Sequence, residues 1–241
     1  MDDPILTIDE REAINNGRWF SSLSPSLRHD ILRCAYVKRF KNGELIAARG
    51  EPPEDWIACA KGAVRVSSTS ISGKQITLTY VEPGIWFGDI AIFDGDRRTH
   101  DAYAHGETTI FCVAKADFRK ILALHVELYE AMLRLHARRL RQLFGLVEDL
   151  NTLPLRARLA KQLLHLARSY GVPSLSDNNE VRIGLQLAQE ELAQLLGASR
   201  QRVNQELKAM EREEAIRIEP AGLVVRNRST LLRISDADLE K

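Results

Sequence analysis

The spacing of apolar residues changes along the chain, and each change marks a different kind of element. Residues 8–36 have helical spacing, and Ser24-Pro25 predicts a helix start because serine caps helices and proline suits their first turn. Short alternating runs replace this pattern between residues 37 and 114. The runs cover residues 44–46, 55–58, 63–67, 75–80 and 109–113, with glycines expected to form turns around them: Gly43, Gly50, Gly62, Gly73, Gly84, Gly88, Gly95 and Gly106. Many short strands with regular turns predict a sandwich or jelly-roll barrel.

Helical spacing returns after residue 114. Asp117 is expected to cap a short helix through Leu122, and a proline-free helix is expected from Val126 to Leu150. Two columns of this helix repeat every seven residues, which is the pattern of a coiled-coil seam. The columns are Val126, Leu133, Leu140 and Val147, and Tyr129, His136, Leu143 and Leu150. Other apolar residues lie off the seam and can pack on the barrel of the same chain: Leu128, Met132, Leu135, Phe144 and Leu146.

A helix that is apolar on two sides needs two partners. The pattern therefore favours a parallel homodimer over a long helix buried within a monomer, and a two-fold protein also matches a palindromic DNA site. The residues expected at the dimer interface are Leu133, His136, Leu140, Leu143, Val147 and Leu150.

The rest of the chain predicts a second domain. The stretch at 151–154, which ends in Pro154, breaks the long helix and is expected to be a hinge. After it we expect a helix at 155–170, a polar loop at 171–180, a strand at 181–183, a hairpin of 216–219 with 223–226 around 220–222, and a last short helix beginning at 229–232.

The segment 187–207 is the most informative of the chain, because it predicts a helix, a tight turn at Gly197 and a second helix capped by Ser199. The apolar residues expected to face the core are Leu192, Leu195, Leu196, Val203, Leu207 and Met210. The opposite side of the second helix carries long donors and amides: Arg200, Gln201, Asn204, Gln205 and Lys208. Side chains of this kind reach base edges and phosphates in a DNA major groove, so the segment predicts a helix-turn-helix, with the 216–226 hairpin as its wing.

Composition adds limits to this picture. The 241 residues allow one to two domains, and the formal net charge of +1 argues against a non-specific, purely electrostatic coat on nucleic acid. Cys34, Cys59 and Cys112 are an odd, scattered set, so we expect buried thiols in a reducing cytoplasm and neither a disulfide framework nor an iron–sulfur cluster. From the acidic start we expect no signal peptide, and from the lack of a long apolar run we expect no membrane span.

The order of barrel, dimer helix, hinge and winged helix-turn-helix resembles the cyclic-AMP receptor protein / fumarate-nitrate reductase regulator (CRP/FNR) family. The resemblance covers residues 20–235 and is carried by two motifs, at 87–99 and 189–207. It implies an α+β fold with a sensory jelly-roll barrel at 1–116, a dimerisation helix and hinge at 117–153, and a winged helix-turn-helix domain at 154–241. It also implies a cytoplasmic, dimeric transcription regulator that binds a palindromic operator and RNA polymerase.

The first motif matches the family's phosphate-binding cassette for a cyclic nucleotide. The matching ligand-binding positions are Gly88, Asp89, Ile90, Ala91, Arg98 and Thr99. Backbone amides at a helix start can hold an anion, Gly88 allows close approach, and Arg98 can form a two-pronged pair with a phosphate. Asp89 is expected to accept a hydrogen bond from a ribose hydroxyl.

Three departures from the family pattern put the ligand in question. The acidic residue is Asp89 where cyclic-AMP binders usually have glutamate, and Leu143 and Phe144 stand where they have a hydroxyl pair against adenine. His100 and Asp101 follow Thr99 in place of small residues. A cyclic nucleotide with different base recognition, a cyclic dinucleotide, and an empty barrel held shut by an Asp89–Arg98 pair all stay open. Haem is disfavoured because no second axial ligand is apparent that could bind a haem iron together with His136.

The second motif carries the DNA contacts that the resemblance implies. Arg200 is expected to read guanine, while Gln201 and Gln205 stand where well-known members have a glutamate and an arginine. Gln189, Ser199, Arg202 and Lys208 complete the expected DNA-binding set, mainly for phosphates. The alternative for Arg202 and Lys208 is a solvated helix face on which Glu206 pairs with either.

Two other function classes are open on the residues alone. An effector-independent regulator would share the DNA-binding domain, whereas a barrel enzyme would need clustered metal ligands. Only His100 and His105 lie in the barrel region, near Asp101 and Glu107, which is thin support for a metal site.

Overall fold

The computed structural model describes residues 6–70, 73, 75–174, 180–220 and 222–236. The chain divides into two compact units, residues 1–140 and residues 141–241, which meet within the long helix α5 (Glu127–Thr152). The three-part division expected from the sequence therefore stays a prediction. None of the helices in the described part of the chain is long and apolar enough to cross a membrane.

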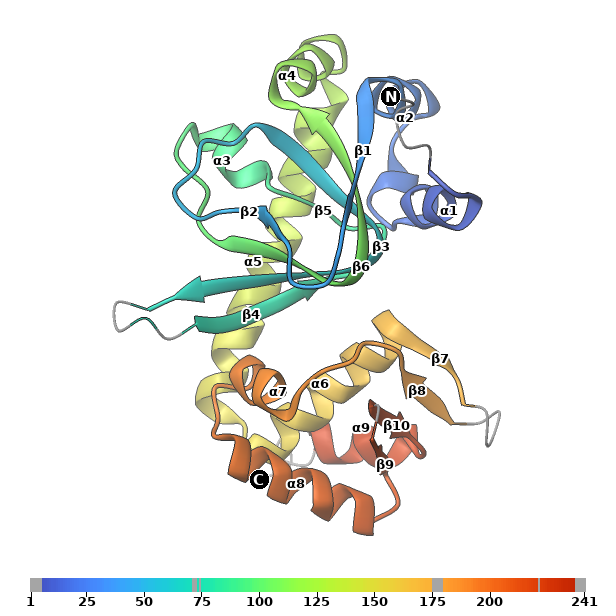
Figure 1. The fold of residues 1–241 in the computed structure, drawn as a ribbon, viewed down its shortest axis with the longest axis vertical. Coiled ribbons are helices and arrows are strands. Elements are labelled where there is room, and N and C mark those ends of the chain that lie inside the picture. The colour runs from blue at the N-terminus through green and yellow to red at the C-terminus, as the bar shows by residue number, and fades with distance from the viewer. Residues whose placement is uncertain (1–5, 71–72, 74, 175–179, 221, 237–241) are drawn as a thin grey trace. The chain divides into compact units, whose positions relative to one another are not determined.

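The N-terminal unit is built on an antiparallel sheet (Figure 1). Its described strands are β1 (Ala35–Phe40), β2 (Leu45–Ala47), β3 (Asp55–Thr69), β4 (Gln75–Val81), β5 (Trp86–Phe87) and β6 (Asp101–Ala114). They run in the order β1-β6-β3-β4, with β2 on β6 and β5 on β3. The expected antiparallel β-domain is confirmed, and β1 already begins at Ala35, where helical spacing was expected to continue.

Two of the expected glycine turns are wrong. Gly62 and Gly106 lie inside the long strands β3 and β6, where the register between the strands shifts around residues 59–63. Gly62 has φ +75, and a Cβ there would lie 2.4 Å from the carbonyl oxygen of Glu107. Glycine is therefore required by crowding at an irregularity of the strand pair, which local spacing cannot distinguish from a turn.

Helices surround the sheet of this unit. They are α1 (Ile8–Asn16), the 3-10 turn η1 (Phe20–Ser22), α2 (Pro25–Cys34), α3 (Asp89–Asp94), α4 (Lys115–Leu124) and the first part of α5. Ser24 caps α2 as expected, by accepting a hydrogen bond from the backbone N–H of Leu27. Asp117 does not cap α4, because Ala114 holds that position and Asp117 lies in the first turn, paired with Lys120 at 2.8 Å.

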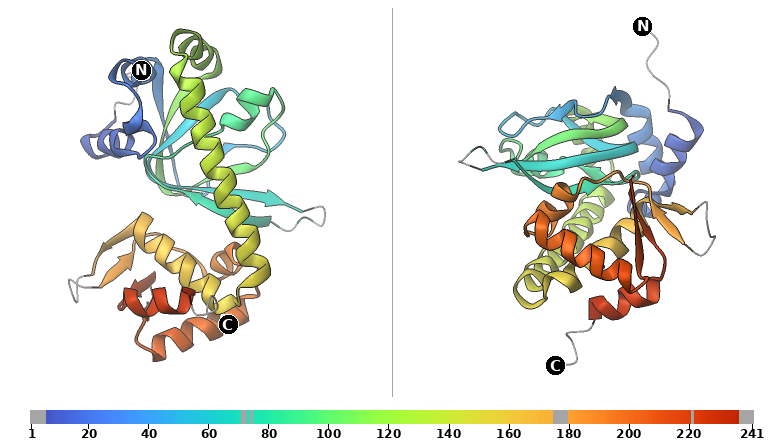
Figure 2. Two further views of the ribbon diagram at one scale, coloured as in Figure 1. Left: turned by 180° about the vertical axis from the view of Figure 1, so that it is seen from behind. Right: turned by 60° about the horizontal axis from the view of Figure 1, so that its bottom comes forward.

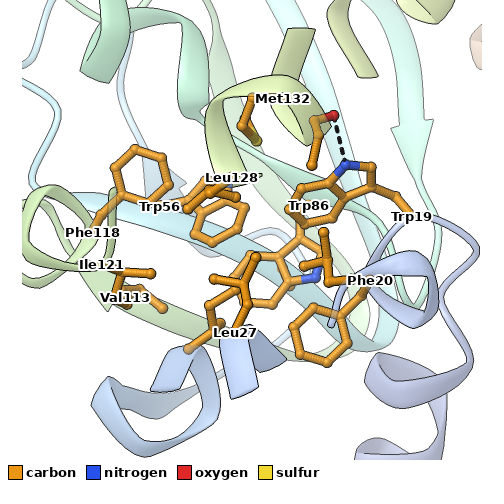
Figure 3. Close-up of a cluster of buried hydrophobic side chains, with 14 of the residues drawn as sticks. Trp19, Phe20, Leu27, Trp56, Trp86, Val113, Phe118, Ile121, Leu128 and Met132 are labelled. Atoms are coloured by element: carbon orange, nitrogen blue, oxygen red, sulfur yellow. Dashed lines mark hydrogen bonds between the residues drawn. The ribbon is translucent and has the colours of Figure 1, made fainter. Parts of the chain in front are cut away.

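Helix α5 runs along the barrel (Figure 2), and a cluster of aromatic side chains holds it there (Figure 3). The ring centroids of Trp56 and Trp86 are 4.0 Å apart, and Trp19 donates its Nε1–H to the carbonyl of Ala131 at 3.1 Å. Leu128 and Met132 of α5 are buried in the same cluster, as the off-seam pattern predicted. This packing fixes which face of α5 turns toward α3.

Two further off-seam residues, Phe144 and Leu146, are exposed, and their packing on the barrel stays a prediction. The seam of α5 is exposed as well, over Tyr129, Leu133, Leu140, Leu143, Val147 and Leu150. Apolar exposure on this scale along one helix is typical of surfaces that bind another protein, and the dimer itself stays a prediction.

The C-terminal unit contains the predicted winged helix-turn-helix elements. They are α6 (Leu155–Tyr170), β7 (Gly171–Pro173), β8 (Val181–Ile183), α7 (Gln189–Leu195), α8 (Arg200–Arg212), β9 (Ile216–Glu219), β10 (Gly222–Val225) and α9 (Arg228–Asp236). The strand order is β7-β8-β10-β9, and β9 with β10 is the expected wing. Residues 171–173 were expected in a polar loop but form β7 on β8, and residues 175–179 of that loop lie outside the described residues.

Candidate DNA-binding and ligand-binding sites

The two helices α7 and α8 meet at a turn whose shape is set by two residues. Gly197 has φ +60, a left-handed conformation that glycine adopts without strain. Ser199 caps α8 by accepting a hydrogen bond from the backbone N–H of Arg202 at 3.4 Å, as predicted. The cap and the turn together fix where α8 begins, and therefore which side chains lie in its first turn.

The helix α8 has one fully buried face and one exposed face. Val203, Leu207 and Met210 are buried, as the spacing predicted. The exposed side carries Arg200, Gln201, Arg202, Gln205 and Lys208, while Gln189 at the start of α7 and Asn204 are partly exposed. Leu195 is also only partly buried, although the pattern predicted burial. The structure thus brings the expected base- and phosphate-contacting residues onto one accessible surface, with their DNA roles still predictions.

An ion pair that the sequence did not predict holds α8 on α6. Arg156 contacts both carboxylate oxygens of Glu213 at 2.6 Å and lies 3.5 Å from Glu206. The alternative interpretation of this face paired Glu206 with Arg202 or Lys208, but Glu206 pairs with Arg156 and both of those cations lie on the open face. Arg156 lies 50 and 57 residues before the two glutamates, so only the packing of α6 against α8 reveals the pairing.

The wing is held by a second charge cluster. Glu180 is buried and pairs with Arg217 of β9 at 2.7 Å and with Arg226 at 2.9 Å. Arg217 also pairs with Glu219 at 3.0 Å. Because Glu180 directly precedes β8, the cluster ties β8 to the two strands of the wing, β9 and β10.

The helix break in the hinge segment lies where the sequence predicted it. The helix α5 ends at Thr152 and α6 starts at Leu155, after Pro154. An ion pair of 2.7 Å between Asp149 and Lys161 spans the break. Motion at this break stays a prediction.

The cassette of the N-terminal unit surrounds the start of α3. Gly88 has φ +82, which favours glycine, and a Cβ there would lie 3.0 Å from a guanidinium nitrogen of Arg98. Ile90 and Thr99 are exposed, whereas Ala91 is buried. The Arg98 guanidinium therefore lies close beside the backbone of Gly88 at the start of α3, where a bound anion would meet this cation.

The guanidinium of Arg98 donates to the backbone carbonyl of Asp55 at 3.0 Å. Among the residues that the structure describes, no carboxylate lies within ion-pairing distance of Arg98. Burial lowers the pKa of Arg98 from its usual value, against the opposing effect of nearby acidic groups. A partly desolvated cation without a direct counter-ion suits an anionic ligand.

Asp89 is not paired with Arg98, so the one alternative in which this pair holds an empty barrel shut does not apply. Its partners come from α5: Arg139 at 2.9 and 3.1 Å, and the Nε2 of His136 at 2.5 Å. Arg139 also donates to the carbonyl of Trp86. Burial of Asp89 opposes its ionisation, but the bonds from His136 and Arg139 outweigh burial and hold its pKa below the usual value.

The sequence predicted neither partner of Asp89. Arg139 was not singled out, and His136 was assigned to the dimer seam, whereas its ring contacts Asp89 and lies 5.9 Å from the ring of Phe93 within its own chain. The sequence signal for this contact is the presence of two basic residues, His136 and Arg139, on an otherwise apolar face of α5. Its target, 47 and 50 residues away, could not be identified without the fold.

The barrel histidines do not form a metal centre. His100 contacts the hydroxyl of Thr99 at 2.8 Å, and His105 packs edge-on against Tyr80. Within the described ranges, no group of three histidine, cysteine or acidic side chains could hold a metal ion. Among the cysteines, Cys59 and Cys112 are buried and Cys34 is half-buried.

Comparison with known proteins identifies two domain families along the chain. Residues 37–125 match the cyclic nucleotide-binding domain, and residues 157–234 match the Crp-like helix-turn-helix domain. The chain is 31% identical over 214 residues to the CRP-like cAMP-activated global transcriptional regulator of Mycobacterium tuberculosis, covering 89% of this chain and 94% of the relative.

Solved structures show the same fold. FixK2 from Bradyrhizobium japonicum superposes with a TM-score of 0.73 at 21% identity, over 83% of this chain and 96% of that one. A CRP-family transcriptional regulator from Thermus thermophilus superposes with a TM-score of 0.68 at 28% identity, over 82% of this chain and 96% of that one.

Fold and sites together define a helix-turn-helix transcription regulator that carries a cyclic nucleotide-binding domain. The chain belongs to the CRP/FNR family of transcription regulators. It is a DNA-binding transcription factor and not an enzyme.

Proposed function

We propose that this chain acts as a homodimer which binds a palindromic operator in a sequence-specific way, with an affinity that a ligand in the N-terminal unit modulates. One observation carries the proposal: α8 is buried along Val203, Leu207 and Met210 and presents donors and amides on its other side. A helix so arranged can lie in a major groove without unfolding any of its core.

The sequence preference follows from the first turns of α8. Arg200 can donate two hydrogen bonds to O6 and N7 of guanine, and Gln201 suits adenine N6 and N7. Gln189, Ser199 and Arg202 are placed for phosphates, and Gln205 and Lys208 extend the same surface. Selection of binding sites from random DNA tests the proposal: a two-fold motif with guanine at a fixed half-site position supports it, and recovery without any motif overturns it.

The dimer is supported by the exposed seam of α5. Leu133 is 68% exposed and Leu140 is 53% exposed, which is unfavourable unless a second helix covers them. A charged residue in such a seam opposes a coiled coil. Light scattering of the wild type and of Leu140→Lys tests this, since we expect a dimer and a monomer respectively, and a wild-type monomer would refute the dimer.

A cyclic nucleotide or a cyclic dinucleotide is the proposed ligand class. The proposal rests on the match to the cyclic nucleotide-binding domain, on Arg98 beside Gly88, and on the exposed hydroxyl of Thr99. Leu143 and Phe144 are both apolar and cannot donate hydrogen bonds to a purine edge, so recognition of the base differs from that of adenine-specific members. The relative from Mycobacterium tuberculosis is described as cAMP-activated.

Ligand binding would act on DNA affinity by favouring one arrangement of α5 at the break between Thr152 and Leu155. Calorimetry against cyclic mono- and dinucleotides, followed by operator binding with and without the ligand that binds, tests this step. Equal operator affinity in both conditions would leave a regulator that works without an effector. We further propose that the protein binds its operator in the cytoplasm and contacts RNA polymerase there.

A further inference from the structure

We propose that Asp89 is a permanent anchor between α3 and α5 and not a ligand contact, and that His136 is the residue that closes it to a ligand hydroxyl. The inference rests on the proposed ligand class and departs from the role that the cassette pattern implies for Asp89. It makes His136 a specificity-determining residue of the ligand-binding site.

The first step is the access of a ligand to the carboxylate of Asp89. The Nη1 of Arg139 donates to both carboxylate oxygens, at 3.1 Å to Oδ1 and at 2.9 Å to Oδ2, and the Nε2 of His136 lies 2.5 Å from Oδ2. The two side chains of α5 thus cover the carboxylate, and Asp89 is only 1% exposed. A ribose hydroxyl therefore finds no opening at Asp89.

The second step identifies which contact keeps a ligand hydroxyl away from Asp89. Arg139 is held twice, by Asp89 and by the carbonyl of Trp86, so it belongs to the fixed part of the anchor. The side chain of His136 is 36% exposed and lies between Asp89 and the ring of Phe93. Removal of the imidazole would free one position on Oδ2 on the side that faces solvent, while both bonds from Arg139 remain.

The third step concerns the proton. The ionised carboxylate can only accept, so the Nε2 of His136 carries a hydrogen and donates it. A glutamine at position 136 can also donate through its side-chain amide, whereas an alanine cannot. The pair His136→Gln and His136→Ala therefore separates loss of the donor from loss of the ring.

Binding of cAMP and of 2′-deoxy-cAMP, measured by calorimetry on the full chain, tests the inference. We expect the wild type and His136→Gln to bind the two nucleotides equally. His136→Ala should bind cAMP about tenfold more tightly than 2′-deoxy-cAMP, because one hydrogen bond to a charged acceptor becomes available. Tenfold discrimination by the wild type would overturn the inference and leave the proposed ligand class standing.

A second measurement does not depend on a ligand. In nitrogen-15 NMR spectra, the Nε2–H proton of His136 should be visible and protected from exchange with water in the ligand-free chain. It should remain so at saturating cAMP. Absence of this protected proton overturns the anchor even if no cyclic nucleotide binds, and failure of all nucleotides to bind while the proton persists overturns the ligand class alone.

Discussion

Arg39 on β1 holds the buried carboxylate of Glu10 on α1 through both of its terminal nitrogens, at 2.6 and 3.0 Å. The same carboxylate accepts hydrogen bonds from the hydroxyl of Thr109 at 2.7 Å and from the backbone N–H of Thr7 at 2.8 Å. Glu10 thus completes the capping box of α1 and joins this helix to β1 and β6 at one point.

This arrangement makes the stability of the N-terminal unit sensitive to acid. The Arg39 hydrogen bonds lower the pKa of Glu10 to about 2, against a usual value of 4.5. A lowered folded-state pKa contributes stability that is present above pH 4.5 and is lost as the pH falls toward 2. We expect Glu10→Gln to reduce the free energy of unfolding by about 3 kcal/mol at pH 7.

Urea unfolding of the wild type and of Glu10→Gln at pH 7 and pH 3 measures this effect. The difference between them should shrink at pH 3. Glu107→Gln is the control, because Glu107 is exposed and pairs only loosely with Lys61, at 3.7 Å. Equal losses in the two variants would contradict the prediction.

Two glycine-to-alanine changes should have opposite signs. A Cβ at Gly17 would lie 2.3 Å from the carbonyl oxygen of Gly84, which is backbone and cannot move aside, so Gly17→Ala should cost about 2–3 kcal/mol. Gly145 is within α5 with no neighbouring atom within 4 Å of a Cβ, so Gly145→Ala should add about 0.5–1 kcal/mol of helix stability. Thermal unfolding of both variants checks the two signs, and two shifts in the same direction would disagree with this geometry.

The exposed start of α8 predicts separable effects on DNA binding. Arg200→Ala should lose roughly 10- to 100-fold of operator affinity, since a bidentate base contact is worth about 1–3 kcal/mol, while the dimer stays intact. Gln201→Glu should instead change the preferred base at one half-site position. Arg212→Ala, at the exposed C-terminal end of the same helix, is the control for loss of a positive charge.

Gel shifts with the operator and a mutated operator measure the first variant, and selection from random DNA measures the second. Undiminished discrimination by Arg200→Ala, or the same selected motif for Gln201→Glu and the wild type, would refute the assigned contacts.

The three thiols should differ in reactivity. Burial raises the pKa of both Cys59 and Cys112 to about 12, so only about one molecule in ten thousand carries the thiolate at pH 8. We expect iodoacetamide to modify Cys34, which is half-buried, in the native chain and all three thiols in denaturant. Mass spectrometry of Cys34→Ser provides the control, because the native variant should stay unmodified.

Local spacing was sufficient to predict the DNA-binding surface. The Ser199 cap and the apolar residues Val203, Leu207 and Met210 lie within twelve residues of one another, so helical periodicity identified both faces of α8. The same reasoning failed at Asp117, because acidic residues favour the whole first turn of a helix and do not mark its cap alone.

Residues brought together from distant segments could not be predicted in this way. The partners of Asp89 and of Glu206 come from other helices, and the crowding at Gly62 depends on the neighbouring strand β6. In the sequence, a histidine in a seven-residue repeat resembles a seam residue. Only the packing of α5 on the barrel shows that His136 faces Asp89. The resemblance to a family identified the cassette positions. It did not identify the partners that Asp89 has in this chain.

The pairing of the strands also determines when the barrel can form during synthesis. Strand β6 pairs with β1, β2 and β3, and it is the last of the six described strands of this sheet to leave the ribosome. The hairpin of β3 and β4 can form early because its strands are close in sequence. Strands β1 and β2 must wait for residues 101–114, so the apolar faces of the nascent domain stay open until then and are exposed to aggregation or to chaperones.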